Sequence, residues 1–358
     1  MKKRALALCL ALLLILAGCG KKAGPEPEPE PEDTYPVLPA EPEPEPEPEV
    51  PAGTNPLTGL PMEPEQERLR PIAVMLNNLK AAQPQLGISQ ADIIYEVPVE
   101  GGITRMLGVY QTVEDVEILG SIRSARPYFV ELALGHDAIY VHAGGSQEAY
   151  SDLYSWKVDH MDGVRGGGDA KIFWRDQERR RNNGYEHSLI TSGEKILDYL
   201  STAKFSTEHN AAWSYPQTFT EDGTPSGGEA AQKVQLRFSA YKTAVFDYDA
   251  GSGKYLVSQY GKEHVDGSTG NQVSATNVLV LETSTAVLDS EGRLRVKTTG
   301  EGSGTFFCGG RAEAIHWSRE DRNSPFAYTL ENGAPLPLGQ GNSYVCIISP
   351  KTSTLQYE

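Results

Sequence analysis

Apolar runs and helical stretches alternate over the first part of the sequence, from about residue 71 to residue 204. The short apolar runs predict buried strands at 71–76, 92–97, 105–111 and 137–141. Helical periodicity predicts helices at 124–134, 146–154 and 192–204. Ser124 and Ser146 stand at N-cap positions, and Pro127 falls in a first turn, where its missing N–H costs little.

The pattern changes after about residue 230, where short strand candidates follow one another. They lie at 234–240, 244–248, 255–260, 278–282, 294–298, 312–318, 326–330 and 344–348. Turns rich in Gly, Asn and Asp, such as Asn332-Gly333, separate them. We therefore expect an α/β (α+β) N-terminal domain with a layered sheet at 54–205, a linker or insert at 206–232, and a smaller, mainly-β C-terminal domain at 233–358.

The N-terminus has the pattern of a secretory signal. Three basic residues precede an unbroken apolar run at 5–17, which is too short to span a bilayer. The run ends in Leu16-Ala17-Gly18-Cys19, which resembles a bacterial lipobox. We expect a signal peptide at 1–18 and lipidation of Cys19, which would anchor the protein to the cell membrane on its extracytoplasmic face. The alternative is a secreted protein with an unrelated cysteine.

The chain has a formal net charge of -16, and a large share of its acids and prolines lies near the N-terminus. Residues 25–49 contain ten acids, ten prolines and no bases, which predicts an extended, self-repelling stalk within 19–53. A Pro-rich ligand for a partner domain is the alternative. Outside residues 1–50 the chain has 27 bases against 38 acids. An acidic body excludes general nucleic-acid binding, which requires a basic surface.

Strong catalytic signatures are missing from the sequence. It has no Walker A loop, GxSxG elbow, HExxH, paired CxxC or EF-hand loop. The seven histidines lack ligand spacing, and His160 with Asp162 is better explained as surface residues of a loop than as a metal site. We therefore expect no metal and no cofactor, and the sequence indicates no mechanism.

Two segments that each join a predicted strand to a predicted helix are candidates for anion binding. Arginine forks match phosphate or carboxylate, glycines permit close approach, and helix N-termini attract anions. The candidates are Arg105, Arg123, Ser124 and Arg126 around the first junction, and His142, Gly144, Gly145 and Ser146 in the second. The alternative is that the serines are ordinary caps and the arginines pair with nearby acids such as Glu131.

A third candidate is the basic stretch at 171–187, which stands out in an acidic protein. Arg175 adds a further guanidinium, Trp174 has a ring suited to stacking on a sugar or a lipid headgroup, and His187 follows. The alternative is a solvated loop with a core tryptophan. Farther along, His264 and Asp266 form a pair that fits a turn better than an active site.

Cys308 and Cys346 both lie near predicted strands of the β half. Export permits a disulfide bond between them, but a spacing of this kind does not establish the geometry. The bond is therefore one alternative and two free thiols the other.

Several of these segments are similar to the YerB-like lipoproteins, a two-domain family of unknown function from Gram-positive bacteria. The likeness is carried by PIAVMLNNLKAAQPQLGISQADIIYEVPVEGGITRMLGVYQ, by ILGSIRSARPYFVELALGHDAIYVHAGGS, and by FWRD with a later HSLITS. One departure is Glu186, since a proline is expected directly before His187. The resemblance implies a lipoprotein with two domains and supplies no reaction.

Three functions are consistent with these observations. The first is an envelope module that binds an anionic or glycan ligand, or a protein partner, through the junction segments. The second is an enzyme acting on a phosphorylated, polyprenyl-phosphate-type precursor, with Asp92, Glu96 and Glu100 as the nearest carboxylates for a metal. The third is a structural or assembly role in the envelope or in sporulation.

Overall fold

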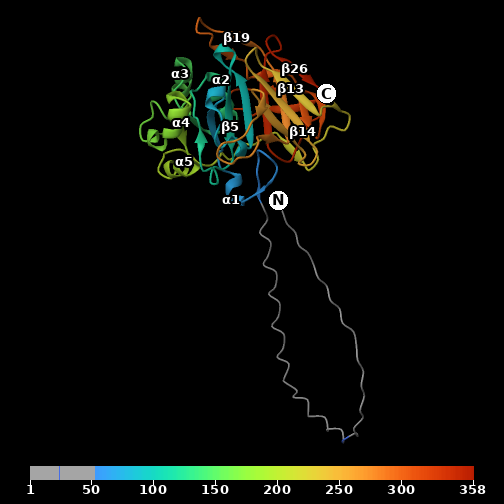
Figure 1. Ribbon diagram of the computed structural model, residues 1–358, viewed down its shortest axis with the longest axis horizontal. Helices are drawn as coiled ribbons and strands as arrows, with labels where there is room; N and C mark the ends of the chain where they lie inside the picture. The colour runs from blue at the N-terminus through green and yellow to red at the C-terminus, as the bar shows by residue number, and fades with distance from the viewer. Residues whose placement is uncertain (1–23, 25–52) are drawn as a thin grey trace, which may run out of the picture. The chain divides into compact units, whose positions relative to one another are not determined.

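The computed structural model describes Gly24 and residues 53–358, and residues 53–358 lie within one compact unit (Figure 1). The predicted signal peptide, Cys19 and nearly all of the Glu/Pro segment lie outside the described residues. Among the helices of the described part, none is both long and apolar enough to cross a bilayer.

An eleven-stranded mixed sheet runs through both halves of the chain. Its order is β12-β22-β21-β18-β25-β4-β5-β3-β7-β8, with β23 beside β22. The strands are β3 (Ile72–Asn77), β4 (Ile93–Pro98), β5 (Thr104–Tyr110), β7 (Ile139–His142), β8 (His160–Asp162), β12 (Glu229–Ala230), β18 (Asn277–Glu282), β21 (Gly300–Cys308), β22 (Arg311–Arg319), β23 (Ala327–Leu330) and β25 (Ser343–Ile348). The halves meet where β4 pairs in parallel with β25, which places Ile94 opposite Tyr344. The domain boundaries expected at 205 and 233 stay a prediction.

Each face of the main sheet has its own apolar core. Side chains alternate between the faces of a strand, so Val74 and Leu76 belong to one core while Ala73 and Met75 belong to the other. Helix α5 (Gly193–Leu200) packs on the first core, and α2 (Pro127–Gly135) and α3 (Gln147–Ser155) pack on the second. The shorter elements are α1 (Pro64–Glu67), α4 (Gln177–Asn182) and the 3-10 turns η1 (Lys80–Ala82), η2 (Ile88–Gln90), η3 (Glu100–Gly102), η4 (Asp169–Ile172) and η5 (Tyr185–His187).

A second sheet covers the first core in the C-terminal half. It consists of β16 (Lys262–Glu263), β15 (Lys254–Gln259), β14 (Thr243–Asp249), β13 (Lys233–Arg237) and β26 (Thr354–Tyr357), with β17 (Ser274–Ala275) beside β15. Phe246 of β14 stands edge-on to Tyr344 of the main sheet, with ring centres 5.0 Å apart. The predicted fold class is confirmed: a mixed α/β region with a large sheet precedes a mainly-β region (Figure 1).

Short strand pairs complete the fold. They are β1 (Gly53–Thr54) with β2 (Pro61–Met62), β11 (Thr218–Thr220) with β24 (Pro337–Gly339), β19 (Thr285–Val287) with β20 (Leu294–Val296), and the set β6 (Leu119–Gly120), β10 (Leu189–Thr191) and β9 (Trp174–Arg175). Every predicted strand overlaps an observed one. Among the described strands of four or more residues, β21 and β26 were not predicted, nor were most of the shorter strands.

Two helix boundaries differ from the prediction. Ser124 is not a cap, because α2 begins at Pro127 and Arg126 occupies the N-cap position without a side-chain bond. The helix expected at 192–204 ends at Leu200. The cap predicted at Ser146 is confirmed, since its Oγ accepts from the amide of Ala149 at 3.1 Å.

The disulfide alternative for Cys308 and Cys346 is wrong, because both are free, buried thiols. Strand β18 lies between their strands β21 and β25 in the sheet. In addition, Cys308 belongs to the core under α2 and Cys346 to the core on the opposite face. Thiols on opposite faces of a sheet cannot reach disulfide distance.

Candidate functional site

The two junction segments lie side by side. Ala125 forms a parallel bridge with Gly145, and its amide donates to the carbonyl of Gly144 at 2.9 Å. The amide of Ala143 donates to the carbonyl of Arg123, also at 2.9 Å. The backbone therefore holds the turn that follows β7 against the segment that precedes α2.

The basic third segment joins the first junction through a small sheet. Strand β10 pairs with both β6 and β9, so the residues around Gly120 and those around Trp174 share one neighbour. The amide of Ile122 continues this pairing by donating to the carbonyl of Leu189 at 2.8 Å. All three candidate segments are thus contiguous in the structure.

These segments gather at the carboxyl ends of parallel strands. β3 ends at Asn77 and β7 ends at His142, and the two strands pair in parallel, so both ends lie at the same edge. Ligands of open α/β sheets tend to bind beyond this edge. We call the group formed by Asn77, Arg123, Arg175 and the turn 185–187 the Arg123 site.

Two of the predicted arginines are buried and share one carboxylate. Arg126 donates to both carboxylate oxygens of Glu100, with Nε at 3.1 Å from Oε2, and Arg105 donates to Oε1 at 3.2 Å. Arg105 and Arg126 are 7% and 9% exposed. We call these three residues the Glu100 cluster. The acid that pairs with the arginines is Glu100 and not Glu131, which accepts from the hydroxyl of Thr298 instead.

The charges of the Glu100 cluster shift one another's pKa values. Burial alone would raise the pKa of Glu100, but the hydrogen bond from Arg126 and the two guanidinium charges hold it below its ordinary value. Burial, together with the nearby charges of Arg126 and Arg123, lowers the pKa of Arg105 to about 10. Three guanidiniums thus lie close together with one half-buried carboxylate between two of them.

Arg123 is the least neutralised of the three. Its side chain keeps 19% of its surface exposed, and its hydrogen bonds to the carbonyl and carboxylate of Glu186 are long, at 3.3 and 3.4 Å. The Glu186 side chain is itself 74% exposed. Exposed ion pairs of this kind contribute little to stability, so another anion can replace the carboxylate at low cost.

His187 belongs to the same turn as Glu186, the residue that Arg123 contacts. Asn77 Nδ2 donates to His187 Nδ1 at 2.9 Å, and the buried Arg179 fixes the turn by donating from Nε to the carbonyl of His187 at 3.1 Å. Burial and the charge of Arg123 lower the pKa of His187, so the imidazole is neutral at pH 7. A neutral imidazole next to a free guanidinium can still donate from Nε2 to an anion.

Arg175 reaches the turn from its other side. Its guanidinium donates to the carbonyl of Tyr185 at 2.6 Å and stacks on the Tyr185 ring, with its carbon 3.5 Å from the ring centre. Trp174 is partly buried, and the ammonium of Lys195 lies 5.7 Å from its ring centre. Tyr185, which sequence reasoning did not single out, is 57% exposed and forms the outer surface of the site.

In the second junction, the backbone amide of Gly144 is already hydrogen-bonded and is not available to an anion. The Gly144 amide donates to Asp162 Oδ1 at 2.9 Å, and His142 Nδ1 donates to the Gly144 carbonyl at 2.8 Å. Burial lowers the pKa of His142 to about 4. Asp162 is 2% exposed and also accepts from Tyr150 Oη at 2.7 Å, so its interpretation as a surface residue is wrong.

His264 and Asp266 lie apart from these segments. Asp266 accepts from the amides of Gly87 and Ser89 at 3.0 and 2.8 Å, which ties the two halves of the chain together. His264 shares a hydrogen bond with Gln85, and burial lowers its pKa to about 3. The pair stabilises loops in the way that the turn interpretation expected.

The three carboxylates considered for a metal do not converge. Asp92 stands before the start of β4, Glu96 is buried within the strand, and Glu100 follows its end. Among the described residues, no group of three or more His, Cys, Asp or Glu side chains has the arrangement to hold a metal ion. The three carboxylates therefore lie in separate environments.

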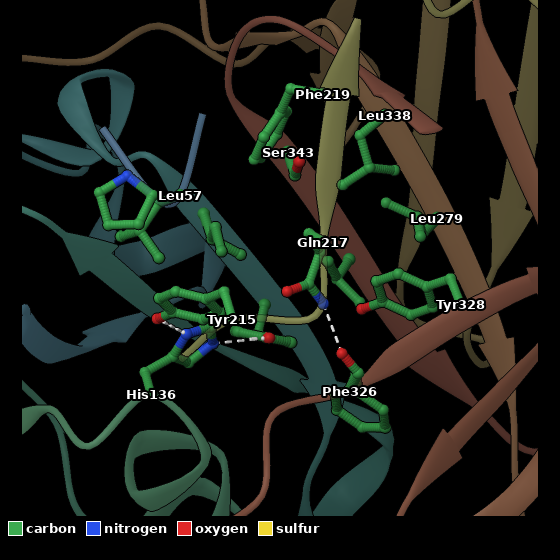
Figure 2. A pocket seen from close by; sticks show the side chains of 14 residues that line it. Leu57, His136, Tyr215, Gln217, Phe219, Leu279, Phe326, Tyr328, Leu338 and Ser343 are labelled. Atoms are coloured by element: carbon green, nitrogen blue, oxygen red, sulfur yellow. Dashed lines mark hydrogen bonds between the residues drawn. The ribbon is translucent and has the colours of Figure 1, made fainter. Parts of the chain in front are cut away.

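A small cavity lies elsewhere and is lined in part by residues of the segment 215–219 (Figure 2). Its volume, measured as the space open to the centre of a water molecule, is about 20 Å³. His136 lines it and contacts the hydroxyls of Tyr95 and Tyr215 with its two ring nitrogens. Burial lowers the pKa of His136 to about 3. The space suits a single water molecule and excludes a larger ligand.

Sequence reasoning missed Asn77, and it did not pair Glu100 or Glu186 with an arginine. The signal for Asn77 was available, because it ends a buried apolar run at the carboxyl edge where ligands gather. No local signal identifies Glu100 or Glu186, since each meets its arginine across 26 or 63 residues of sequence.

Comparison with known proteins defines the family. Residues 57–206 match the N-terminal domain, and residues 234–345 the C-terminal domain, of the protein family of unknown function DUF3048. The chain belongs to this family.

Two comparisons lead to Bacillus subtilis. "Putative lipoprotein YerB" of strain 168 is 32% identical over 297 residues, which cover 82% of this chain and 85% of the relative. The crystal structure of YerB protein from the same species superposes with a TM-score of 0.74 at 28% identity, covering 85% of this chain and 99% of that one. The resemblance expected from the sequence is confirmed.

Proposed function

We propose that this chain is a membrane-anchored, extracytoplasmic lipoprotein whose body binds an anionic envelope ligand at the Arg123 site. The lipobox-like Leu16-Ala17-Gly18-Cys19 and the printed name of the Bacillus subtilis relative support the lipid anchor. The ligand class is a phosphate-bearing molecule, with a glycan as its carrier.

The observation that carries the anion proposal is the contrast among the arginines. Arg105 and Arg126 are buried and share the carboxylate of Glu100, whereas Arg123 has only long bonds to an exposed carboxylate. A phosphate oxygen at the position of the Glu186 carboxylate would meet Arg123 and lie beside the neutral His187. Such charge-assisted hydrogen bonds are about twice as strong as neutral ones.

The glycan part of the proposal rests on the surface around this point. Tyr185 is exposed beside Arg175, and Trp174 lies one residue away from Arg175. Aromatic rings of this kind supply apolar contact area to a ligand whose charged end is held elsewhere.

Calorimetric titration with inorganic pyrophosphate tests the proposal. We expect binding to the unmodified chain, and about tenfold or greater loss of affinity in Arg123→Gln, because one charged hydrogen-bond donor contributes about 1.5–3 kcal/mol. Arg295→Gln is the matched control: it removes the same charge from the exposed strand β20 and should leave the affinity unchanged. Equal affinity in the Arg123 variant and the unmodified chain, or no binding to either, would contradict the proposal.

A further inference from the structure

A second polar cluster is wholly enclosed between the two sheets. Lys242, Glu96 and Gln259 are 1%, 0% and 3% exposed, and they come from both halves of the chain. Lys242 precedes β14, Gln259 ends β15, and Glu96 lies in β4 of the main sheet. Fully buried lysine and glutamate side chains are rare and require an explanation.

The amine of Lys242 contacts both other side chains. Its Nζ lies 3.1 Å from Glu96 Oε1 and donates a hydrogen bond to Gln259 Oε1. Because Ala244 pairs with Gln259 across the two strands, the backbone holds the amine close to the Gln259 carboxamide. The amide nitrogen of Gln259 is buried and has no hydrogen-bond partner within the part of the chain that the structure describes.

Glu96 is held rigidly in place. Its carboxylate accepts from Asn78 Nδ2 at 2.9 Å, from Thr104 Oγ1 at 2.6 Å and from Tyr344 Oη at 2.5 Å. Burial lowers the pKa of Lys242, which favours the neutral amine over the ammonium. A neutral amine is a nucleophile, and an adjacent carboxyl group can carry its proton.

We propose that Lys242 and Gln259 condense in the folded protein to form an intramolecular isopeptide bond, with Glu96 as the general acid and base. The Lys242 Nζ lone pair attacks the carboxamide carbon of Gln259, and the bond between that carbon and Nε2 breaks. Glu96 takes one proton from Nζ and delivers one to Nε2, which leaves as ammonia. The reaction has no other reactant: an amine and a primary amide give a secondary amide and ammonia.

The structure favours this bond over a simple ion pair. Removing two charges from water is expensive, and here the pair is joined by a carboxamide whose nitrogen makes no hydrogen bond. Condensation converts the amine into a neutral amide N–H and removes the orphaned nitrogen. The new bond closes the β14–β15 hairpin covalently, as a disulfide would, in a protein whose two described cysteines are free.

Mass spectrometry of the full-length chain, purified and digested with trypsin, tests the proposal. Trypsin does not cleave after a modified lysine, so we expect a branched peptide in which residues 238–254 are joined to residues 255–262. Its mass should be lower than the sum of the two peptides by one ammonia molecule. Recovery of the unmodified peptides 238–242, 243–254 and 255–262 would overturn the proposal, as would a branched peptide that joins Lys242 to Asn78.

Two variants separate the bond from the packing around it. Lys242→Met keeps an unbranched side chain but removes the nucleophile, and Gln259→Met keeps a side chain of similar length but removes the carboxamide that the amine attacks. We expect the branched peptide to disappear in both, with a melting temperature lower by roughly 5 °C, because a cross-link restricts the conformations of the unfolded chain. Either variant retaining the branched peptide would overturn the assignment, whatever its melting temperature.

Discussion

The Glu100 cluster and the Arg123 site contain arginines only three positions apart in the sequence, yet they place them in opposite surroundings. Arg126 is 9% exposed and donates to both oxygens of one carboxylate. Arg123 keeps more exposure and makes only long bonds to Glu186 at the surface. The difference follows from the elements around them, because the turn η3 brings Glu100 to Arg126 whereas η5 brings a solvated acid to Arg123.

This difference separates an arginine whose charge stabilises the fold from one whose charge is available to bind an anion. A buried arginine that has lost its carboxylate is costly, whereas an exposed arginine loses little when its partner is replaced. Substitutions in the two regions should therefore differ in kind: those in the Glu100 cluster should affect folding, and those at the Arg123 site should affect binding.

The largest effect is expected at Glu100. Glu100→Gln leaves Arg105 and Arg126 without a neutralising charge, which should lower the free energy of unfolding by about 3–5 kcal/mol. Glu186→Gln is the matched substitution at the Arg123 site and should change it by less than about 0.5 kcal/mol. Urea denaturation of both variants measures the difference. Similar losses of stability in the two would remove the distinction between the regions.

The next test measures how the free energy of unfolding depends on pH and compares the buried His142 with an exposed histidine. Burial lowers the pKa of His142 from 6.5 to about 4, so the unfolded chain binds the proton first as the pH falls. The contribution of neutral His142 to folding stability is present above pH 6.5 and is lost as the pH falls from about 6.5 to 4. This loss amounts to about 3 kcal/mol.

The variant His142→Gln should therefore lose less stability between pH 7 and pH 4.5 than the unmodified chain does. His316→Gln, at an exposed position of β22, serves as the control and should follow the unmodified chain. Parallel pH profiles for all three proteins would show that burial of His142 does not contribute to acid sensitivity.

Much of the fold could be predicted from apolar runs, since strands such as β3 and β4 are buried on both faces. Strand β21 could not be predicted in this way, because Gly302 and Gly304 interrupt its apolar pattern. The structure explains these glycines: a Cβ on Gly302 would lie 2.6 Å from Trp317 Nε1, and one on Gly304 would lie 2.8 Å from the carbonyl of Val280. Close packing between strands, rather than strand propensity, determines these residues.

The site could be predicted only in pieces. Arg123, Arg175 and His187 were each recognised from local composition, but their proximity depends on the pairing of β10 with β6 and β9. The parallel pairing of β4 with β25 likewise joins residues some 250 positions apart. Local patterns carry no information about such partners, which explains why Glu100 was considered as a metal ligand and not as the partner of Arg126.

Whether Arg123 binds an anion beside His187 can be measured by NMR, as the pKa of His187 with and without pyrophosphate. Burial and the charge of Arg123 lower this pKa in the free protein. A bound anion should offset the charge of Arg123 and favour the protonated imidazole, so the account predicts an increase of about one pKa unit. An unchanged pKa for His187 at saturating pyrophosphate would contradict it.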